Sequence, residues 1–253
     1  MPLAQGLILN CLKGSLKVLN LNNNRIGSKG VQLICEALKD HSKLESLFLD
    51  DNGIDSDGAH SICKLLSVTG DSSSLDLVSN LKELHVAHNR MASAGGLSLI
   101  LETLSKSNKS LKFLDISFNL IDIGALRPLR LMLERNTTLQ YLTVSDLHKF
   151  NSRAIESLSE SLATSTGVKL VDFKRTTKSF FKTIERGVNA LREQVGKPSI
   201  VFLRDSQYIA AAATDTSRIS ETRKAQKKAS KQGRSRTPEP AARPKPRARS
   251  SSG

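Results

Sequence analysis

One repeating pattern of leucines decides what this chain can fold into. The spacing Leu-x-x-Leu-x-Leu-x-x-Asn-x-Ile runs from Leu16 to Ile26 and recurs from Leu44 to Ile54, and two further copies begin at Leu81 and Leu111. The asparagines of these four copies lie 28, 37 and 30 residues apart. A unit of about 28 to 30 residues, with one insertion at 67–79, indicates a stack of similar supersecondary units.

Two further copies are weaker. The fifth keeps Leu139, Leu142 and Val144 but has Leu147 in place of the asparagine. The sixth retains only the apolar positions of its strand, Val168, Val171 and Phe173. The repeat therefore loses its turn residue before it loses its strand.

Each unit reads as a short strand followed by a helix. Alternate positions of L-x-x-L-x-L point to one side of a strand, so the leucines face a core and the intervening residues face outward. Apolar residues at helical spacing follow, preceded by serines that predict helix N-caps and by glycines that predict close helix packing. These residues are Ser28, Ser56 and Ser93, and Gly30, Gly58 and Gly95.

The pattern resembles the leucine-rich repeat in its long, ribonuclease-inhibitor-like form, over about residues 5–203. The resemblance implies an α/β fold, a curved solenoid with parallel strands on its concave face and helices on its convex face. In such repeats the asparagine side chain bonds neighbouring backbone groups. The resemblance implies this structural role for Asn24, Asn52, Asn89 and Asn119, and an irregular fifth turn at Leu147.

Three segments are expected. Residues 1–203 form the solenoid with its terminal caps, 204–217 connect, and 218–253 form a basic tail. A helix at 178–195 and a strand at 199–203 predict the C-terminal cap. The first strand is covered by the helix-like residues 3–12, or else by a partner or by upstream sequence. The insertion 67–79 predicts a mobile surface loop, and the tail lacks the apolar residues needed for an ordered fold.

Positive charge is concentrated in the tail. Residues 1–167 carry 17 basic and 17 acidic side chains, whereas residues 218–253 carry 12 basic and 2 acidic ones. Without aromatic residues the tail attracts polyanions but cannot stack on bases. Nucleic acid, acidic protein tails, anionic membranes and nuclear import all fit it. The candidate polyanion-binding residues are Arg223, Lys224, Lys227, Lys228, Lys231, Arg234 and Arg236.

Catalysis, cofactors and metals are not expected. The sequence contains no phosphate-binding loop, dinucleotide fingerprint, nucleophile elbow or HExxH motif. His85 and His88 are close in sequence, but one belongs to a strand and the other to the following turn, so we expect no metal between them. The cysteines Cys11, Cys35 and Cys63 occupy apolar positions and are expected to be reduced core residues.

The outward strand positions predict a binding face. Stacked strands bring them into three rows on the concave side. The first is Val18, Ser46, Glu83, Phe113, Tyr141 and Leu170; the second is Asn20, Phe48, His85, Asp115, Thr143 and Asp172; the third is Asn22, Asp50, Ala87, Ser117, Ser145 and Lys174. Aromatic and acidic members suggest a partner with apolar and basic character. The candidate partner-binding residues are Phe48, Glu83, His85, Phe113, Asp115, Tyr141 and Asp172.

These features favour a non-enzymatic protein–protein interaction scaffold or adaptor, whose basic tail attaches to an anionic cytoskeletal, axonemal or nucleic-acid surface. Similar repeats occur in ribonuclease inhibitors, innate immune receptors, tropomodulin-like actin regulators and the GTPase activator for Ran. Two alternatives remain, a regulator of a small GTPase and a nucleic-acid-associated adaptor acting through the tail. With no apolar run near 20 residues and no signal peptide, a cytoplasmic location is expected, with cytoskeletal, ciliary or nuclear association.

Overall fold

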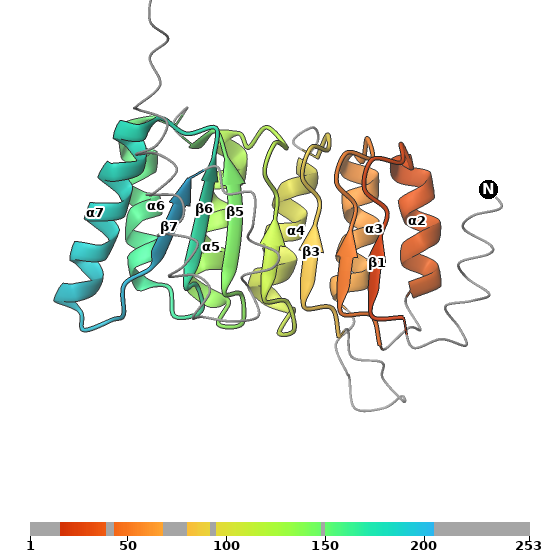
Figure 1. Cartoon of the computed structure of the whole chain (residues 1–253), viewed down its shortest axis with the longest axis horizontal. Coiled ribbons are helices and arrows are strands. Elements are labelled where there is room, and N and C mark those ends of the chain that lie inside the picture. The colour runs from red at the N-terminus through yellow and green to blue at the C-terminus, as the bar shows by residue number, and fades with distance from the viewer. Residues whose placement is uncertain (1–15, 39–42, 68–79, 92–94, 148–149, 205–253) are drawn as a thin grey trace, which may run out of the picture. The chain divides into compact units, whose positions relative to one another are not determined.

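The structure is a computed structural model, and it describes residues 16–38, 43–67, 80–91, 95–147 and 150–204. Within these residues strands and helices alternate along the chain (Figure 1). The elements are β1 (Val18–Asn20), α2 (Gly27–Leu38), β2 (Ser46–Phe48), α3 (Ser56–Leu66), β3 (Glu83–His85), α4 (Gly96–Lys106), β4 (Phe113–Asp115), the 3-10 helix η2 (Ile123–Ala125), α5 (Leu126–Arg135), β5 (Tyr141–Ser145), α6 (Ser152–Thr164), β6 (Leu170–Lys174), α7 (Lys178–Gln194) and β7 (Val201–Arg204).

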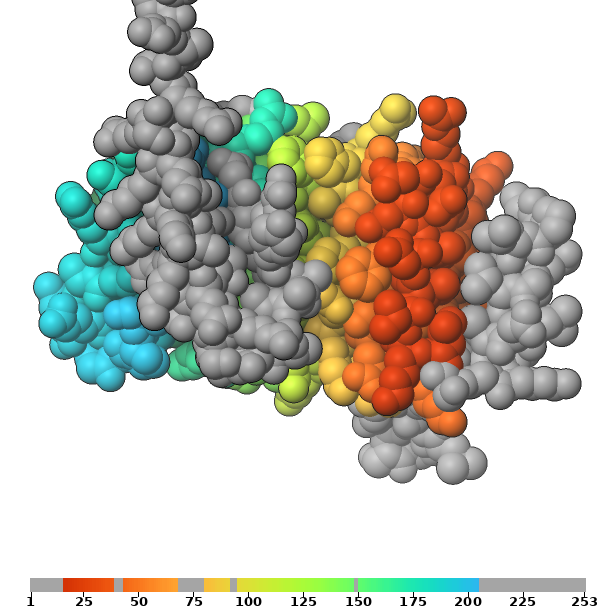
Figure 2. Space-filling model, viewed as in Figure 1, coloured from red at the N-terminus to blue at the C-terminus, as the bar shows by residue number. Residues whose placement is uncertain are grey.

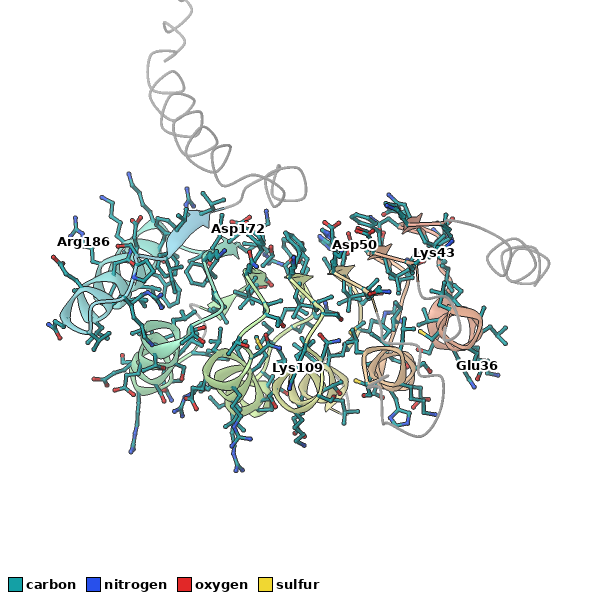
Figure 3. All side chains as sticks on the ribbon, turned by 90° about the horizontal axis from the view of Figure 1, so that it is seen from below. Glu36, Lys43, Asp50, Lys109, Asp172 and Arg186 are labelled. Carbon is teal, nitrogen blue, oxygen red and sulfur yellow. The ribbon has the colours of Figure 1, made fainter. Side chains whose placement is uncertain are left out.

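All seven strands form one parallel sheet in chain order. Equivalent residues of neighbouring repeats pair, so that Leu47 lies between Leu19 and Leu84. The helices cover one face of the sheet, and the strands lie along the inner side of the arc that the helices form (Figure 3). The predicted curved α/β solenoid is therefore confirmed.

Aliphatic side chains fill the layer between sheet and helices. Leu47, Leu84 and Leu114 point from successive strands into this layer and are fully buried, as are Ile62 and Ile100 from the helices. Each such side chain contributes about 1.5 to 3 kcal/mol through burial. The core thus grows by the same few residues in every repeat, which is why so few aromatic residues suffice.

Buried asparagines tie each turn to the one before it. The amide nitrogen of Asn52 donates to the carbonyls of Leu21 and Asp50, and its oxygen accepts the backbone N–H of Asn24 at 3.1 Å. Asn89 repeats the arrangement, accepting from the N–H groups of Asn52 and Ile54. The amide nitrogens of Asn24 and Asn119 likewise donate to backbone carbonyls of the turns that follow the strands. This is the role that the resemblance implies for these residues, and we call the four together the asparagine ladder.

The fifth turn is built differently, as its sequence suggests. Leu147 is buried in the apolar core instead of bonding the backbone. The preceding strand β5 is five residues long and pairs with β6 over its whole length. The hydroxyl of Ser145 accepts the N–H of Phe118 at 2.8 Å. A longer backbone ladder and one hydroxyl thus replace the missing amide.

The predicted serine N-caps are wrong at the two positions that the structure describes. The carboxylate of Asp55 caps α3, accepting from the N–H groups of Asp57 and Gly58. Ser28 lies inside α2, where its hydroxyl donates to Asp55 and accepts the N–H of the same residue, and Ser56 is the first residue of α3. A carboxylate reaches two N–H groups, so it takes the cap, and Ser28 braces it from the neighbouring repeat. Ser93 lies outside the described residues.

The prediction of close helix packing holds for one glycine and shifts for another. A Cβ atom on Gly58 would lie 3.3 Å from the Cα atom of Ser28 in the preceding helix, and one on Gly96 would lie 2.8 Å from that of Ser56. Gly95 instead adopts a left-handed conformation before α4, so Gly96 takes the packing role expected of Gly95. A Cβ atom on Gly30 would collide with Ile26 of its own repeat, and the helix expected before α2 lies outside the described residues, so the helix-packing prediction for Gly30 stays a prediction.

At the C-terminal end, α7 and β7 occupy the positions expected for a cap. Arg192 on α7 is buried, and its guanidinium donates to the carbonyls of Leu162, Ala163 and Ser165 at the end of α6. One side chain thus satisfies several terminal helix carbonyls. The expected N-terminal cap 3–12, residues 68–79 of the insertion and the tail lie outside the described residues. No helix of the described part is long and apolar enough to cross a membrane.

Candidate partner-binding face

Strand pairing places the outward side chains in the rows expected from the repeat. In the first row Glu83 pairs with Ser46 on one side and Phe113 on the other, and Tyr141 pairs with Phe113. In the second row the pairs run from Asn20 through to Asp172, the residues being Asn20, Phe48, His85, Asp115, Thr143 and Asp172. Every sequence-predicted partner-binding residue therefore lies on one face of the sheet, opposite the helices.

Four flat rings stack across this face from β2 to β5, and we call them the aromatic ladder: Phe48, His85, Phe113 and Tyr141. The ring centroids of Phe48 and His85 are 4.4 Å apart, and those of His85 and Phe113 are 4.6 Å apart. Phe113 and Tyr141 follow at 6.3 Å. These separations are close to the favourable range for aromatic pairs, so the ladder is a continuous stack of rings crossing four repeats.

The ladder is more buried than the sequence suggests. Phe113 and Tyr141 are only 3% and 4% exposed, although neither belongs to the core between sheet and helices. Phe48 is half-buried. Burial also raises the pKa of the Tyr141 hydroxyl. Phe113 and Tyr141 therefore lie on the predicted face but offer a partner almost no exposed surface.

Glu83 holds His85 within the ladder. One carboxylate oxygen lies 3.0 Å from Nε2 of His85, and the other accepts the hydroxyl of Ser46 at 2.8 Å. Burial alone would raise the pKa of Glu83, but the hydrogen bonds from His85 and Ser46 and the charge of His85 outweigh it, so the pKa is lowered. Glu83 thus orients the ring of His85 between its two aromatic neighbours.

Two further carboxylates, Asp50 and Asp115, lie beside the ladder. Asp50 accepts the N–H of Ala87 at 2.7 Å and the amide of Asn22 at 3.1 Å. Asp115 accepts the N–H and the hydroxyl of Ser117. Burial, followed by the negative charge of Asp115, raises the pKa of Asp50 to about 6 against the opposing charges of His85 and His88. Within the described part of the chain, neither carboxylate forms a salt bridge.

The far end of the same row is different. Asp172 is fully buried and pairs with the ammonium group of Lys174 at 2.7 Å. Between Asp115 and Asp172 lies Thr143, which is 1% exposed and whose hydroxyl has no hydrogen-bond partner among the described residues. Along the second row, therefore, a carboxylate without a described salt bridge (Asp115) is followed by a hydroxyl without a hydrogen-bond partner (Thr143) and then by a carboxylate in a salt bridge (Asp172).

A second stack lies in the turns that follow the strands. His88 and Phe118 stack at 4.0 Å, and the guanidinium of Arg175 lies 5.9 Å from the Phe118 ring. The backbone φ angles of these three residues lie between 50° and 57°, in the left-handed region that non-glycine residues rarely adopt. Asn23, Asp51 and Asp146 take the same conformation at the equivalent positions. The repeating turn thus imposes this geometry on whichever residue precedes the asparagine position.

Sequence reasoning missed Thr143, Asp50 and Phe118 as members of a site. The rows placed Thr143 and Asp50 on the face, but the unsatisfied hydroxyl of Thr143 and the absence of a described salt bridge at Asp50 appear only in three dimensions. Phe118 sits directly before Asn119, so its aromatic character was the one available signal. The seven tail residues predicted to bind polyanions lie outside the described residues.

Metal and thiol chemistry find little support here. Among the described residues no three His, Cys, Asp or Glu side chains gather closely enough to hold a metal ion. His85 and His88 stack on different rings. Cys35 and Cys63 are buried free thiols, and burial, with smaller contributions from Cys63 and Glu36, raises the pKa of Cys35 to about 12. Cys11 lies outside the described residues.

The chain is similar to known repeat proteins. A family model for the leucine-rich repeat matches residues 15–35 and 78–99. No curated protein matches the sequence. Two solved structures share the fold, each with a TM-score of 0.51 and covering 64% of this chain: leiomodin-1 actin-binding site 2, at 18% identity over 86% of its length, and the tropomodulin C-terminal domain of Caenorhabditis elegans, at 17% over 92%.

The matched segments coincide with the first and third copies of the leucine pattern, and the structure extends the same unit over seven strands. The long, ribonuclease-inhibitor-like form stays a prediction. The family-model match, the parallel register and the asparagine ladder together show that this chain folds as a leucine-rich-repeat solenoid.

Proposed function

We propose that this protein is a non-catalytic interaction scaffold that binds a protein partner on the concave face of its sheet. One observation carries the proposal: the aromatic ladder lies beside two uncompensated carboxylates, Asp50 and Asp115, on a face that the helices do not cover. Aromatic side chains dominate the energetics of protein interfaces. The carboxylates select a partner with positive charge.

The accessible part of this face is its N-terminal half. Val18 is 54% exposed and Asn20 is exposed, Phe48, Asp50 and Asp115 are half-buried, and Phe113 and Tyr141 are buried. Phe48 is therefore the aromatic residue best placed to contact a partner, with Asp50 just after the same strand and Asp115 two strands along the same row. Because exposure decreases toward the C-terminal strands, we expect partner contacts mainly from the half-exposed members of the predicted set, Phe48, Glu83 and Asp115.

Affinity capture tests the proposal. The full-length chain is immobilised, incubated with native cell extract at low and at high salt, and the bound proteins are identified by mass spectrometry. Phe48→Ala should reduce capture of salt-resistant partners at least fivefold. Glu156→Gln, on the exposed surface of α6, should leave capture unchanged. Equal capture by wild type and Phe48→Ala, with both proteins folded by circular dichroism, would overturn the proposal.

Actin is one partner to test directly. One of the similar structures is actin-binding site 2 of leiomodin-1, but at this identity the likeness shows the fold alone. Cosedimentation of the full-length chain with filamentous actin answers the question. Sedimentation that Phe48→Ala abolishes would place actin on the concave face, and no sedimentation would remove it as a partner.

A second activity is supported by charge alone. We propose that residues 218–253, with 12 basic and 2 acidic side chains, attach the scaffold to an acidic polymer such as nucleic acid or an acidic protein tail. Such binding weakens steeply with salt. Deleting residues 218–253 should abolish it and leave salt-resistant capture intact. The GTPase-regulator alternative is tested by measuring GTP hydrolysis by Ran with and without the protein.

A further inference from the structure

The concave face contains a carboxylate whose counter-ion is missing from the described residues. Of the four acidic side chains in its rows, Glu83 pairs with His85 and Asp172 with Lys174. Asp50 and Asp115 have no such partner and raise each other's energy by repulsion. Because Asp115 is half-buried, water screens this repulsion incompletely. One positive charge placed beside Asp115 would relieve it.

A second observation marks the same place. Thr143 pairs with Asp115 across the β4–β5 register, so the two side chains are neighbours in one row. Its hydroxyl is buried and has no hydrogen-bond partner within the described ranges. A buried hydroxyl without a partner costs free energy that a bound donor would restore. A ligand that donates hydrogen bonds to both groups therefore fits.

The first row places two aromatic rings beside this polar pair. Phe113 lies two residues before Asp115 on β4, and Tyr141 two residues before Thr143 on β5, so both rings point to the same side as the polar pair. A guanidinium group stacks on aromatic rings and also bonds a carboxylate through two parallel N–H groups. In the turns that follow β4 and β6, Arg175 already lies over the ring of Phe118.

We propose that Asp115 and Thr143 bind an arginine side chain of the protein partner, with the guanidinium at the edge of the Phe113 and Tyr141 rings. The N–H groups donate to the carboxylate of Asp115 and to the hydroxyl of Thr143, and Asp50 adds negative charge nearby. Lysine fits less well because its ammonium is a point charge that makes no planar, two-pronged contact. The inference rests on the proposed function, because it names the partner chemistry at the same face.

The test measures peptide binding by the full-length chain. Fluorescein-labelled hexa-arginine and hexa-lysine peptides are titrated with wild type, Asp115→Asn and Thr143→Val, and fluorescence anisotropy gives Kd. Glu156→Gln is the matched control, since it removes one negative charge from an exposed helix. Asp115→Asn should weaken hexa-arginine binding about tenfold and Thr143→Val about threefold, with less than a twofold change in Glu156→Gln and weaker binding of hexa-lysine throughout.

Two results would overturn the inference. One is equal loss in Asp115→Asn and Glu156→Gln, which would mean attraction by overall charge. The other is an equal response of the two peptides, which would remove the preference for guanidinium. If Asp115→Asn unfolds, Thr143→Val still decides, because it keeps the side-chain shape and all charges.

The outcome is separable from that of the proposed function. If Phe48→Ala reduces partner capture but Asp115→Asn does not change peptide binding, the proposed scaffold function is supported and the arginine site is refuted. If neither Phe48→Ala nor Asp115→Asn changes partner capture, the concave interface is refuted, and with it the proposal that a partner's arginine binds there.

Discussion

The first four repeats and the last three strands hold the same sheet together in different ways. In the first group each strand has three residues, and the asparagine ladder links the turns. In the second group the strands have five, five and four residues, and Leu147 and Thr176 stand at the asparagine position. One register can therefore be maintained by side-chain amides or by a longer backbone ladder.

The functional face changes along the same axis. The second row carries an uncompensated carboxylate at β4 and a closed ion pair at β6. Exposure falls from 54% at Val18 to 1% at Leu170 in the first row. The repeats with the most regular turns thus present the most accessible chemistry, while the C-terminal repeats resemble a cap.

The largest expected effect comes from breaking the ladder at its centre. Asn89 makes five hydrogen bonds to backbone groups of two repeats, and removing it strands several buried donors and acceptors. Asn89→Ala should lower the free energy of unfolding by about 4 kcal/mol, measured by urea denaturation. Asn24→Ala, at the exposed first rung, should cost about 1 kcal/mol. Equal costs would refute the ladder as a cooperative element.

The last three strands should be destabilised most by substitution of a different residue, Arg192. Arg192 is 3% exposed and donates to four carbonyls, including that of Pro198. Arg192→Met leaves those carbonyls unsatisfied and should cost about 3 kcal/mol. Arg192→Lys should recover less than half, because an ammonium cannot span the same carbonyls. Full rescue by lysine in thermal melts would show that charge alone suffices.

The half-buried carboxyl group of Asp50 should make the free energy of unfolding depend on pH. The pKa of Asp50 is about 6 in the folded chain and about 3.9 when unfolded, so the folded state holds this proton more tightly. The contribution of Asp50 to the stability is therefore fully present below pH 4, is lost as Asp50 ionises between pH 4 and 6, and stays absent at higher pH. Asp50→Asn should remove this loss.

The gain of Asp50→Asn over wild type should be about 2 kcal/mol larger at pH 7 than at pH 4. Urea denaturation at the two pH values measures it. Asp57→Asn, an exposed residue of α3, serves as the control and should show no comparable difference. A pH-independent gain for Asp50→Asn would contradict the burial argument.

The smallest expected effect concerns the brace between the first two helices. Ser28→Ala removes the hydroxyl that bonds Asp55, the cap of α3. Because Asp55 keeps its own cap bonds, the cost should be about 1 kcal/mol. Asp55→Ala should cost more than Ser28→Ala in the same denaturation series, and the reverse order would show that the serine is the true cap.

The repeat pattern predicted much of this. It identified the strands, the inward leucines, the rows of the face and the structural asparagines, because each depends on spacing that the sequence displays. The cap at Ser56 was misplaced because Asp55, one residue earlier, takes it, and Ser28 because α2 begins at Gly27. Gly95 was misplaced because a one-residue shift makes Gly96 the glycine that touches the neighbouring helix. The unsatisfied Thr143 and the missing counter-ion of Asp115 depend on what lies beside them in space.

Photo-crosslinking tests the central claim most directly, that a partner binds the concave face. Phe48→p-benzoylphenylalanine on β2 and His60→p-benzoylphenylalanine on the exposed side of α3 place the same probe on opposite faces of one repeat. After capture from native extract and irradiation, mass spectrometry identifies the joined proteins. Crosslinks from position 48 and none from position 60 are predicted. Crosslinks from position 60 alone would place the partner on the helices and contradict the claim.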